Sequence, residues 1–399
     1  TLGEVMQATK NTLSSVYKLG FCLIGDPAVK MAYPEFGMKV TTVNGQSVDG
    51  NSISFKALEK ITVEGEVLDA SGQLVTDFTG IVNPTVKDSK VTVTCLKNSN
   101  KDDSPAFTFT DYPNTIFIGN DSVRNGKFSF TFTVPKDISY SNLQGKMNLY
   151  AVDTESGNEA QGNFDNFIVG GTSDTAETDT IGPEIRALYL NDTTFVDGGQ
   201  VNTTPYFVAE LWDKSGVNIT GSSVGHDMML VIDESTVLSY NLNSYYELLP
   251  GEDGTGIVKF PIPALEPGKH TAEFWVWDIL NNSTVRTFTF EVVEGLKPFL
   301  FDVIATPGIA REQVTFHLMH NRPESRMRVG IMVYDLAGRQ LWKHEESGTS
   351  GLFENYTVSW DLTSGGARMR PGVYIYRAAI STDNSKDATK ARKFIILGE

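Results

Sequence analysis

The sequence predicts a mainly β protein in which antiparallel sandwiches follow one another along the chain. Short runs such as residues 61–67 (ITVEGEV) and 128–134 (FSFTFTV) alternate between apolar and polar side chains, as half-buried strands do. Clusters of Gly, Asn, Asp and Pro separate these runs, and helical periodicity of any length is absent after Tyr17. An α/β enzyme core is therefore not expected in residues 40–399.

The first 38 residues depart from this pattern. Apolar residues between Leu2 and Tyr17 recur at helical spacing, and residues 21–24 (FCLI) form a short apolar run that Gly-Asp-Pro closes. We expect one amphipathic helix followed by one buried strand. A lone helix and strand have too little to pack on, so residues 1–38 are interpreted as the C-terminal remnant of an α/β domain whose sheet precedes Thr1.

Length and composition limit the possible organisation and partners. A chain of 399 residues is long enough for two to four domains that each bury a core. The formal net charge of −16 would repel nucleic acid and anionic lipid, so neither is an expected partner. No apolar stretch reaches the roughly 18 residues of a membrane span, and no basic and apolar leader begins the chain.

Two Gly- and Pro-bounded joints divide the β region into modules. The longer joint, within residues 170–183, consists of small polar residues, and the shorter one covers residues 292–298. The expected modules are a first sandwich over 39–171, a linker over 172–182, a second sandwich over 183–295 and a C-terminal β module over 296–399. In the last module, residues 372–380 and 393–397 should pair, and residues 373–376 (VYIY), apolar on both faces, predict a buried central strand.

An Asp-centred pattern recurs in all three modules. A β run is followed by Asp and, a few positions later, by Gly or Asn, at Asp69, Asp153, Asp213, Asp278 and Asp335. The Asp side chain can accept backbone N–H bonds within a turn that Gly or Asn closes. Calcium takes about six to eight oxygen ligands, and no D-x-D-x-D-G loop occurs, so hairpin turns are favoured over metal sites. No metal ion and no cofactor is expected.

Several motifs, taken in order, resemble one family of secreted proteins. Residues 2–11 and 23–35 resemble the end of a gingipain-like cysteine peptidase domain. Residues 225–227 (GHD) and 277–282 (WDILNN) are similar to the sortases of the Bacteroidetes type IX secretion system. Residues 333–339 (VYDLAGR) and 370–377 (RPGVYIYR) resemble the C-terminal sorting domain of type IX clients, although Ala305-Thr-Pro-Gly stands where that domain commonly has an Asn-Pro-Phe-like element.

The resemblance implies tandem immunoglobulin-like β-sandwiches followed by a C-terminal β-sandwich module for sorting and anchoring. It also implies a non-catalytic role for this region, which would space the peptidase domain and dock it to an outer-membrane β-barrel partner at the cell surface. The parent protein would cleave the C-terminal signals of secreted clients and attach the clients to lipopolysaccharide. Its catalytic Cys and His would precede Thr1.

The two cysteines give little support for catalysis by this chain itself. Cys22 and Cys95 both lie in apolar runs and are interpreted as buried free thiols, with a disulfide between them as the alternative. Neither is close in sequence to a histidine that could activate it, so this chain is not expected to be an enzyme. An autonomous hydrolase that uses Cys22 is the rival hypothesis.

A second rival is a surface adhesin or glycan-binding protein. Trp275 and Trp277 lie two apart, hence on one strand face, where they could stack a sugar or pack against another module. His226 could orient a ligand, or it could tie its loop to a neighbour through Asp227. His270, His317 and His320 are interpreted as structural.

Four Asp-Thr or Asp-Ser sites resemble those at which Bacteroidetes O-glycosylate exported proteins. The acceptors would be Thr175, Thr180, Thr193 and Ser122, three of which crowd the linker region. The alternative is that such pairs merely reflect linker composition.

Overall fold

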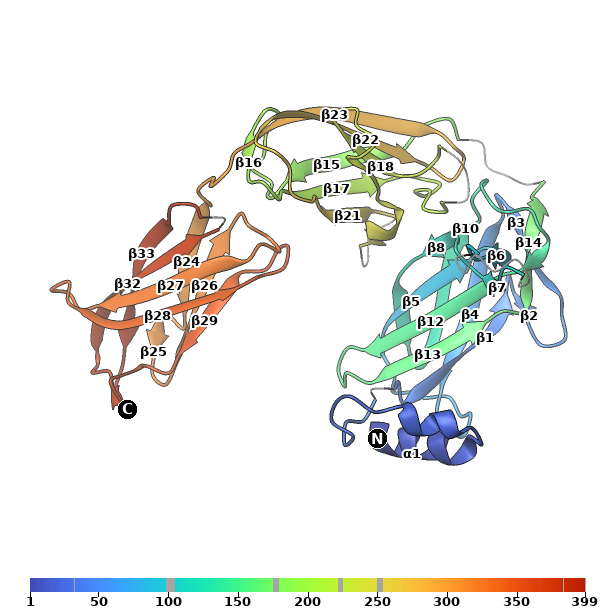
Figure 1. The fold of residues 1–399 in the computed structure, drawn as a ribbon, viewed down its shortest axis with the longest axis horizontal. Coiled ribbons are helices and arrows are strands. Elements are labelled where there is room, and N and C mark those ends of the chain that lie inside the picture. The colour runs from blue at the N-terminus through green and yellow to red at the C-terminus, as the bar shows by residue number, and fades with distance from the viewer. Residues whose placement is uncertain are drawn as a thin grey trace. The chain divides into compact units, whose positions relative to one another are not determined.

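The computed structural model describes residues 1–31, 33–97, 105–174, 179–221, 225–249, 254–382 and 384–398. Strands make up most of the ribbon, which confirms the predicted fold class (Figure 1). The chain divides into two compact units: Thr1–Phe132 with Ser139–Thr172, and Thr133–Ile138 with Ser173–Glu399. Among the described residues, no helix combines the length and the hydrophobicity that crossing a membrane requires.

The predicted N-terminal helix is present as α1, Leu2–Thr12, and a 3-10 helix, Val16–Gly20, follows it. A capping box begins α1, because the Thr1 hydroxyl accepts a hydrogen bond from the Glu4 backbone N–H at 3.3 Å and the Glu4 side chain reaches back to Thr1. Neither helix has a buried residue. The strand predicted over residues 21–24 is not formed, and Ile24 is 97% exposed. That prediction was wrong for this chain because a strand needs a hydrogen-bonded neighbour.

The first unit is built on one curved sheet. Its strands are β1 (Phe36–Val43), β2 (Gln46–Ser47), β3 (Ile53–Ala57), β4 (Lys60–Leu68), β5 (Gly80–Lys87), β6 (Val91–Thr94), β7 (Thr108–Asp111), β8 (Thr115–Ile118), β9 (Asp121–Arg124), β10 (Lys127–Thr133), β11 (Leu143–Gln144), β12 (Lys146–Asp153), β13 (Glu159–Phe164) and β14 (Phe167–Thr172). The order β12-β13-β1-β4-β10-β9-β5-β8 closes on itself, because β5 also pairs with β12. The strands β11-β14-β3 form a smaller sheet, and β6 and β7 form a separate hairpin.

Alternation along the strands places the aromatic core of the first unit. Phe128, Phe130 and Phe132 of β10 are all buried, as the period-two pattern predicted. The Phe132 ring lies 5.9 Å from the ring of Phe55 on β3, so the smaller sheet packs on the larger one through this contact.

The second unit contains a sandwich of two sheets whose strands pair antiparallel, except for the short parallel pair of β16 with β23. The strands and the short 3-10 helix are β15 (Glu184–Leu190), β16 (Gln200–Val201), β17 (Tyr206–Trp212), β18 (Met229–Ile232), β19 (Ser239–Asn241), η2 (Asn243–Tyr245), β20 (Tyr246–Leu248), β21 (Gly256–Pro261), β22 (Gly268–Trp277) and β23 (Ser283–Val292). The sheets have the orders β15-β17-β21-β20 and β16-β23-β22-β18-β19. Phe207 of one sheet and Phe274 of the other, both fully buried, meet with ring centroids 5.0 Å apart.

The C-terminal module of this unit is a further sandwich. Its strands are β24 (Leu300–Thr306), β25 (Ile309–Ala310), β26 (Val314–His320), β27 (Met327–Tyr334), β28 (Gln340–Gly348), β29 (Tyr356–Trp360), β30 (Thr363–Ser364), β31 (Ala367–Arg368), β32 (Gly372–Ser381) and β33 (Ala388–Ile396). The sheet β24-β26-β29 faces the sheet β25-β33-β32-β27-β28, and β30 and β31 pair separately. Phe316 packs against Tyr376 and Phe394 across the two sheets, with ring centroids 4.8 and 6.0 Å apart.

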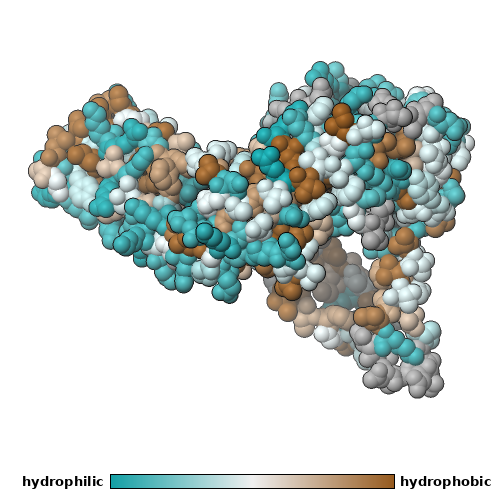
Figure 2. Space-filling model, turned by 90° about the horizontal axis from the view of Figure 1, so that it is seen from above, coloured by the Kyte–Doolittle hydropathy of each residue, from teal (hydrophilic) through white to brown (hydrophobic). Residues whose placement is uncertain are grey.

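Strand β32 is central and pairs with β33, as predicted, but only one of its faces is covered. Tyr374 and Tyr376 are buried in the core, whereas Val373 and Ile375 on the opposite face remain 40% and 38% exposed. The expectation that both faces are buried was therefore wrong for this chain. On the face of the molecule drawn in Figure 2, hydrophobic residues are scattered among hydrophilic ones.

All five Asp-centred turns form, but only those at Asp153, Asp278 and Asp335 join paired strands as hairpins. The turns at Asp69 and Asp213 lie between strands that do not pair with each other, so the hairpin prediction was wrong there. In each of the five turns one carboxylate oxygen accepts two backbone N–H bonds, and a Gly or Asn with positive φ completes the turn; the Asp residues are Asp69, Asp153, Asp213, Asp278 and Asp335. The sequence pattern thus identified a local structure correctly at five places in three modules.

Candidate functional site

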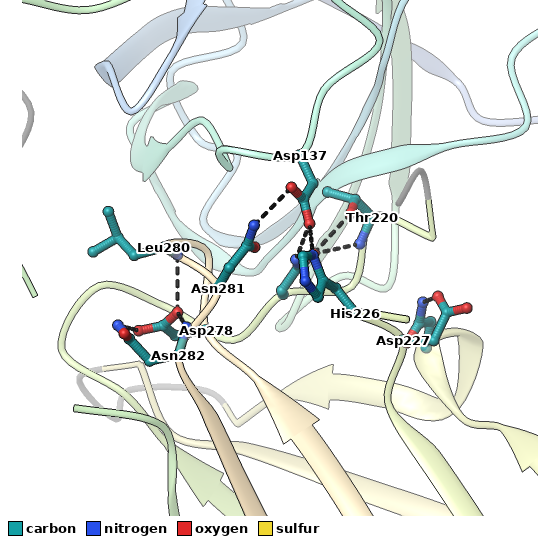
Figure 3. A network of polar contacts seen from close by, with 10 residues as sticks. Asp137, Thr220, His226, Asp227, Asp278, Leu280, Asn281 and Asn282 are labelled. Carbon is teal, nitrogen blue, oxygen red and sulfur yellow. Dashed lines mark hydrogen bonds and ion pairs between the residues drawn. The ribbon is translucent and has the colours of Figure 1, made fainter. Parts of the chain in front are cut away.

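A short segment between β10 and β11 is part of the second unit, and a carboxylate from it organises a polar cluster there. The segment is Thr133–Ile138, and its Lys136 N–H donates to the Ile279 carbonyl at 2.8 Å. Asp137, only 8% exposed, places Oδ2 at 2.6 Å from His226 Nδ1, and its Oδ1 accepts a bond from Asn281 Nδ2 at 2.9 Å (Figure 3). Because the carboxylate is buried, these partners offset the cost of removing it from water.

Asn218 supports the same carboxylate from a second loop. It is 1% exposed, and its Nδ2 donates to Asp137 Oδ2 at 3.4 Å. Its own Oδ1 accepts from both the backbone N–H and the hydroxyl of Thr220, at 3.0 and 2.8 Å. The amide is thereby fixed in orientation, so Asp137 meets a prearranged set of donors.

Two predicted site residues meet here. The His226 ring lies 4.5 Å from the Trp277 ring, centroid to centroid, and the two planes are inclined by 47°. Asp227 does not tie His226 to its neighbour, as one interpretation expected; Asp227 Oδ1 instead accepts a bond from Asn243 Nδ2 at 2.8 Å. The partner of His226 is Asp137, 89 residues earlier in the chain, which sequence spacing could not reveal.

Trp275 and Trp277 share the outer face of β22, as predicted, because Phe274 and Val276 between them are fully buried. Trp275 is half-buried and donates from Nε1 to Glu273 Oε2 at 3.2 Å. Trp277 packs on His226. One of the two indoles is therefore occupied by packing, and the pair does not form an open stacking platform.

Three carboxylates that the sequence did not connect lie together in the second unit. Side-chain oxygens of Asp179, Asp213 and Asp278 are all within 4.8 Å of one another, close enough to share a cation. Burial raises the pKa of Asp213 and of Asp278, whereas hydrogen bonds from Ile181 N–H and the Ser215 hydroxyl lower the pKa of Asp179 at the rim.

Two of these carboxylates belong to turns that the sequence analysis interpreted as structural. The hydrogen bonds of those turns are indeed made, and in Asp213 both turn bonds go to the same oxygen, Oδ1. What brings the turns together is the bridge between Val217 and Asp278, a contact across the sandwich that spacing along the chain does not encode.

A buried arginine, Arg322, and a half-buried histidine, His320, lie where the chain enters the C-terminal module. Arg322 is 1% exposed and donates from Nη2 to the Leu296 carbonyl, at 3.1 Å, in the joint that precedes β24. His320 Nδ1 accepts the backbone N–H of Arg322 at 3.1 Å, so its proton sits on Nε2 and is donated to the Ser350 hydroxyl at 2.9 Å. Burial, and then the charge of Arg322, lower the pKa of His320 to about 4.

The predicted glycosylation acceptors are accessible where the structure describes them. Thr180, Thr193 and Ser122 are exposed, whereas Thr175 lies outside the described residues. Accessibility satisfies a necessary condition for modification, and the assignment of these residues stays a prediction.

The cysteines are free thiols, but they are less buried than predicted. Cys22 is exposed and Cys95 is partly buried, so the expectation of two buried thiols was wrong, and no disulfide joins them. Within the described part of the chain, neither thiol makes a hydrogen bond to a histidine.

Comparison with solved structures finds several similar chains, and the similarity in sequence differs widely among them. The chain is 37% identical over all of its length to dimeric latent PorU from Porphyromonas gingivalis; it spans 38% of that chain, with a TM-score of 0.42. A tetra-tandem repeat from the extending region of a large adhesion protein is 14% identical, with 92% of this chain and 74% of that chain covered and a TM-score of 0.19. The Ig1-2 module of the Drosophila receptor protein tyrosine phosphatase DLAR is 9% identical, with coverages of 55% and 100% and a TM-score of 0.22.

No protein-family profile matches the sequence, and the curated proteins give no match either. The relation to a region of PorU thus depends on the sequence identity.

Proposed function

We propose that this chain is the non-catalytic C-terminal region of a type IX secretion sortase, where it spaces the peptidase domain and docks it at the cell surface. The observation that carries the proposal is the 37% identity to PorU over the whole chain, which covers 38% of the longer protein. In the parent protein, a catalytic Cys and His in the remainder would cut client C-terminal signals and attach the clients to lipopolysaccharide.

The N-terminal segment supports the presence of a further domain. Large apolar side chains that would normally be covered are exposed along it, from 46% at Leu13 to 97% at Ile24; they are Val5, Leu13, Val16, Tyr17, Leu19, Phe21, Ile24, Val29, Met31 and Tyr33. Such a concentration of exposed apolar surface is typical of a protein interface. In the proposed parent protein the peptidase domain covers it.

Hydrogen exchange tests whether the peptidase domain covers the N-terminal segment. In a longer protein that contains the peptidase domain, backbone amides of residues 13–31 should exchange at least about tenfold more slowly than in the present chain. Residues of β32, far from this segment in sequence, serve as the internal control and should exchange equally in both proteins. Equal exchange of residues 13–31 in the two proteins would contradict the proposed cover.

The role in docking belongs to the C-terminal module. Deletion of residues 296–399 from the parent protein should release it from the cell surface while the peptidase domain still cleaves a soluble client peptide. If the shortened, folded protein stays on the outer membrane, the docking role is wrong.

A further inference from the structure

The outer face of the sheet β25-β33-β32-β27-β28 is apolar at one end although no described residue covers it. Val373 and Ile375 of β32 are 40% and 38% exposed, and Ile309 of β25 is 55% exposed. Register places Ile395 of β33 beside both strands, opposite Val373 and Ile309. We call these four residues the apolar patch. In an antiparallel sheet with one face in water, the residues on that face are usually polar, because apolar and polar residues alternate along each strand.

Two cations border the apolar patch. Lys393 lies opposite Ile375, and Arg377 is the next outward residue of β32, so the two cations are diagonal neighbours on the same face. Both are exposed, and neither forms an ion pair with any residue that the structure describes. By contrast, Arg392, which points to the other side, is held by Asp302 at 2.7 Å.

Charge is also segregated along the chain. Residues 296–399 contain 14 Lys and Arg against 11 Asp and Glu, a net charge of +3, whereas residues 1–295 contain 19 against 38, a net charge of −19. The C-terminal module is thus the one positively charged module of an acidic protein, which would direct it toward an anionic surface.

We propose that the outer face of this sheet docks a folded protein whose surface is apolar at the centre and acidic at the edge. The apolar patch would form the centre of the interface, and Arg377 and Lys393 would pair with carboxylates at its rim. This inference rests on the proposed docking role and assigns that role to one face of the module.

The size and shape of this face favour a different protein as the binding partner over a second copy of this chain or a lipid surface. The four long strands β33, β32, β27 and β28 span about 30 Å by about 19 Å, roughly 600 Å², close to the ~800 Å² that each partner contributes to a standard interface. A second copy of the same face would bring like charges together, which disfavours a symmetric dimer through it. The side chains of the patch are β-branched and rise little above the sheet, whereas insertion into lipid uses protruding aromatic residues.

The test measures binding of the full chain to outer membranes of the bacterium that produces it. We expect the double reversal Arg377→Glu with Lys393→Glu to weaken binding at least about tenfold. The control, Arg326→Glu with Arg370→Glu, changes the net charge equally at exposed positions outside the strands and should bind as the unchanged chain does. A third variant, Ile375→Asp, should also weaken binding, and circular dichroism of each variant verifies folding.

Three further binding measurements identify the partner that binds this face. Protease treatment of the membranes should abolish binding, and liposomes of their extracted lipids should bind the chain negligibly; equal binding to the liposomes would overturn the protein partner in favour of lipid. Binding that persists after the double reversal, but is lost on deletion of residues 296–399, would refute this face while leaving the docking role intact. Binding that survives the deletion would refute the docking role itself.

Discussion

The surroundings of His320 predict a pH-dependent loss of stability in the C-terminal module. Its Nδ1 faces the backbone N–H of Arg322, so a second proton on the ring would break that bond and bring two positive charges together. Because the pKa is lowered from 6.5 to about 4 in the folded protein, the unfolded state binds more protons between these values. The stability due to neutral His320 is therefore complete above pH 6.5 and is lost as the pH falls toward 4.

The size of the effect follows from the shift. With a pKa of 6.5 unfolded and about 4 folded, linkage gives a loss of about 2 kcal/mol between pH 7 and pH 5. In His320→Asn the amide oxygen can still accept the Arg322 N–H, but the group does not titrate. At pH 7 the free energy of unfolding of this variant should be about 1 kcal/mol lower than that of the unchanged chain, because the bond to Ser350 is lost. Between pH 7 and pH 5, however, the variant should lose about 2 kcal/mol less of its free energy of unfolding than the unchanged chain does.

Hydrogen exchange of β26 peptides in the full chain, corrected for the intrinsic effect of pH, measures the local free energy of opening. Ser350→Ala is the matched control, because it removes the hydroxyl partner of His320 Nε2 but leaves the imidazole to titrate. It should show the same pH dependence as the unchanged chain. If His320→Asn keeps the full pH dependence, the loss of stability arises from other groups and the reasoning about His320 is wrong.

Two substitutions and one mass measurement provide further tests. Asp213→Asn should raise the free energy of unfolding at pH 7, because burial raises the pKa of Asp213 and thus disfavours the carboxylate; the gain, measured by denaturant unfolding, should shrink as the pH falls toward 4. Tyr374→Asp should cost about 3 kcal/mol or more by placing a charge in the core, whereas an Asp on the exposed side of β32 should cost much less, a difference that a melting temperature reveals. The intact mass of the natural protein should include sugar at one or more of Thr180, Thr193 and Ser122, and an unmodified mass would refute the glycosylation.

Local patterns predicted local structure well. The five Asp-centred turns are correct because an Asp carboxylate and a Gly or Asn with positive φ interact within about five residues, a range that sequence spacing describes fully. The alternation in β10 likewise identified its buried phenylalanines, because the period of a strand is set by the backbone alone.

Contacts between distant segments could not be predicted in the same way. Asp137 and His226 meet because a segment between two strands of the first unit belongs to the second, and neither residue carries a local signal of the other. The cluster of Asp179, Asp213 and Asp278 similarly depends on which ends of the sandwich carry the turns. Composition marks such residues as polar, but only the fold shows which of them are neighbours.

Two of the expectations that failed, the strand over residues 21–24 and the burial of the second face of β32, have a common physical cause. In both places the sequence is apolar enough to predict burial, yet Ile24 is 97% exposed and Val373 is 40% exposed. An apolar run indicates that a surface is covered in the working protein, but it does not specify whether the cover comes from the same polypeptide segment. If the proposed peptidase domain covers residues 21–24 and a docking partner covers β32, the sequence pattern describes the assembly, and each exposed run locates one of its interfaces.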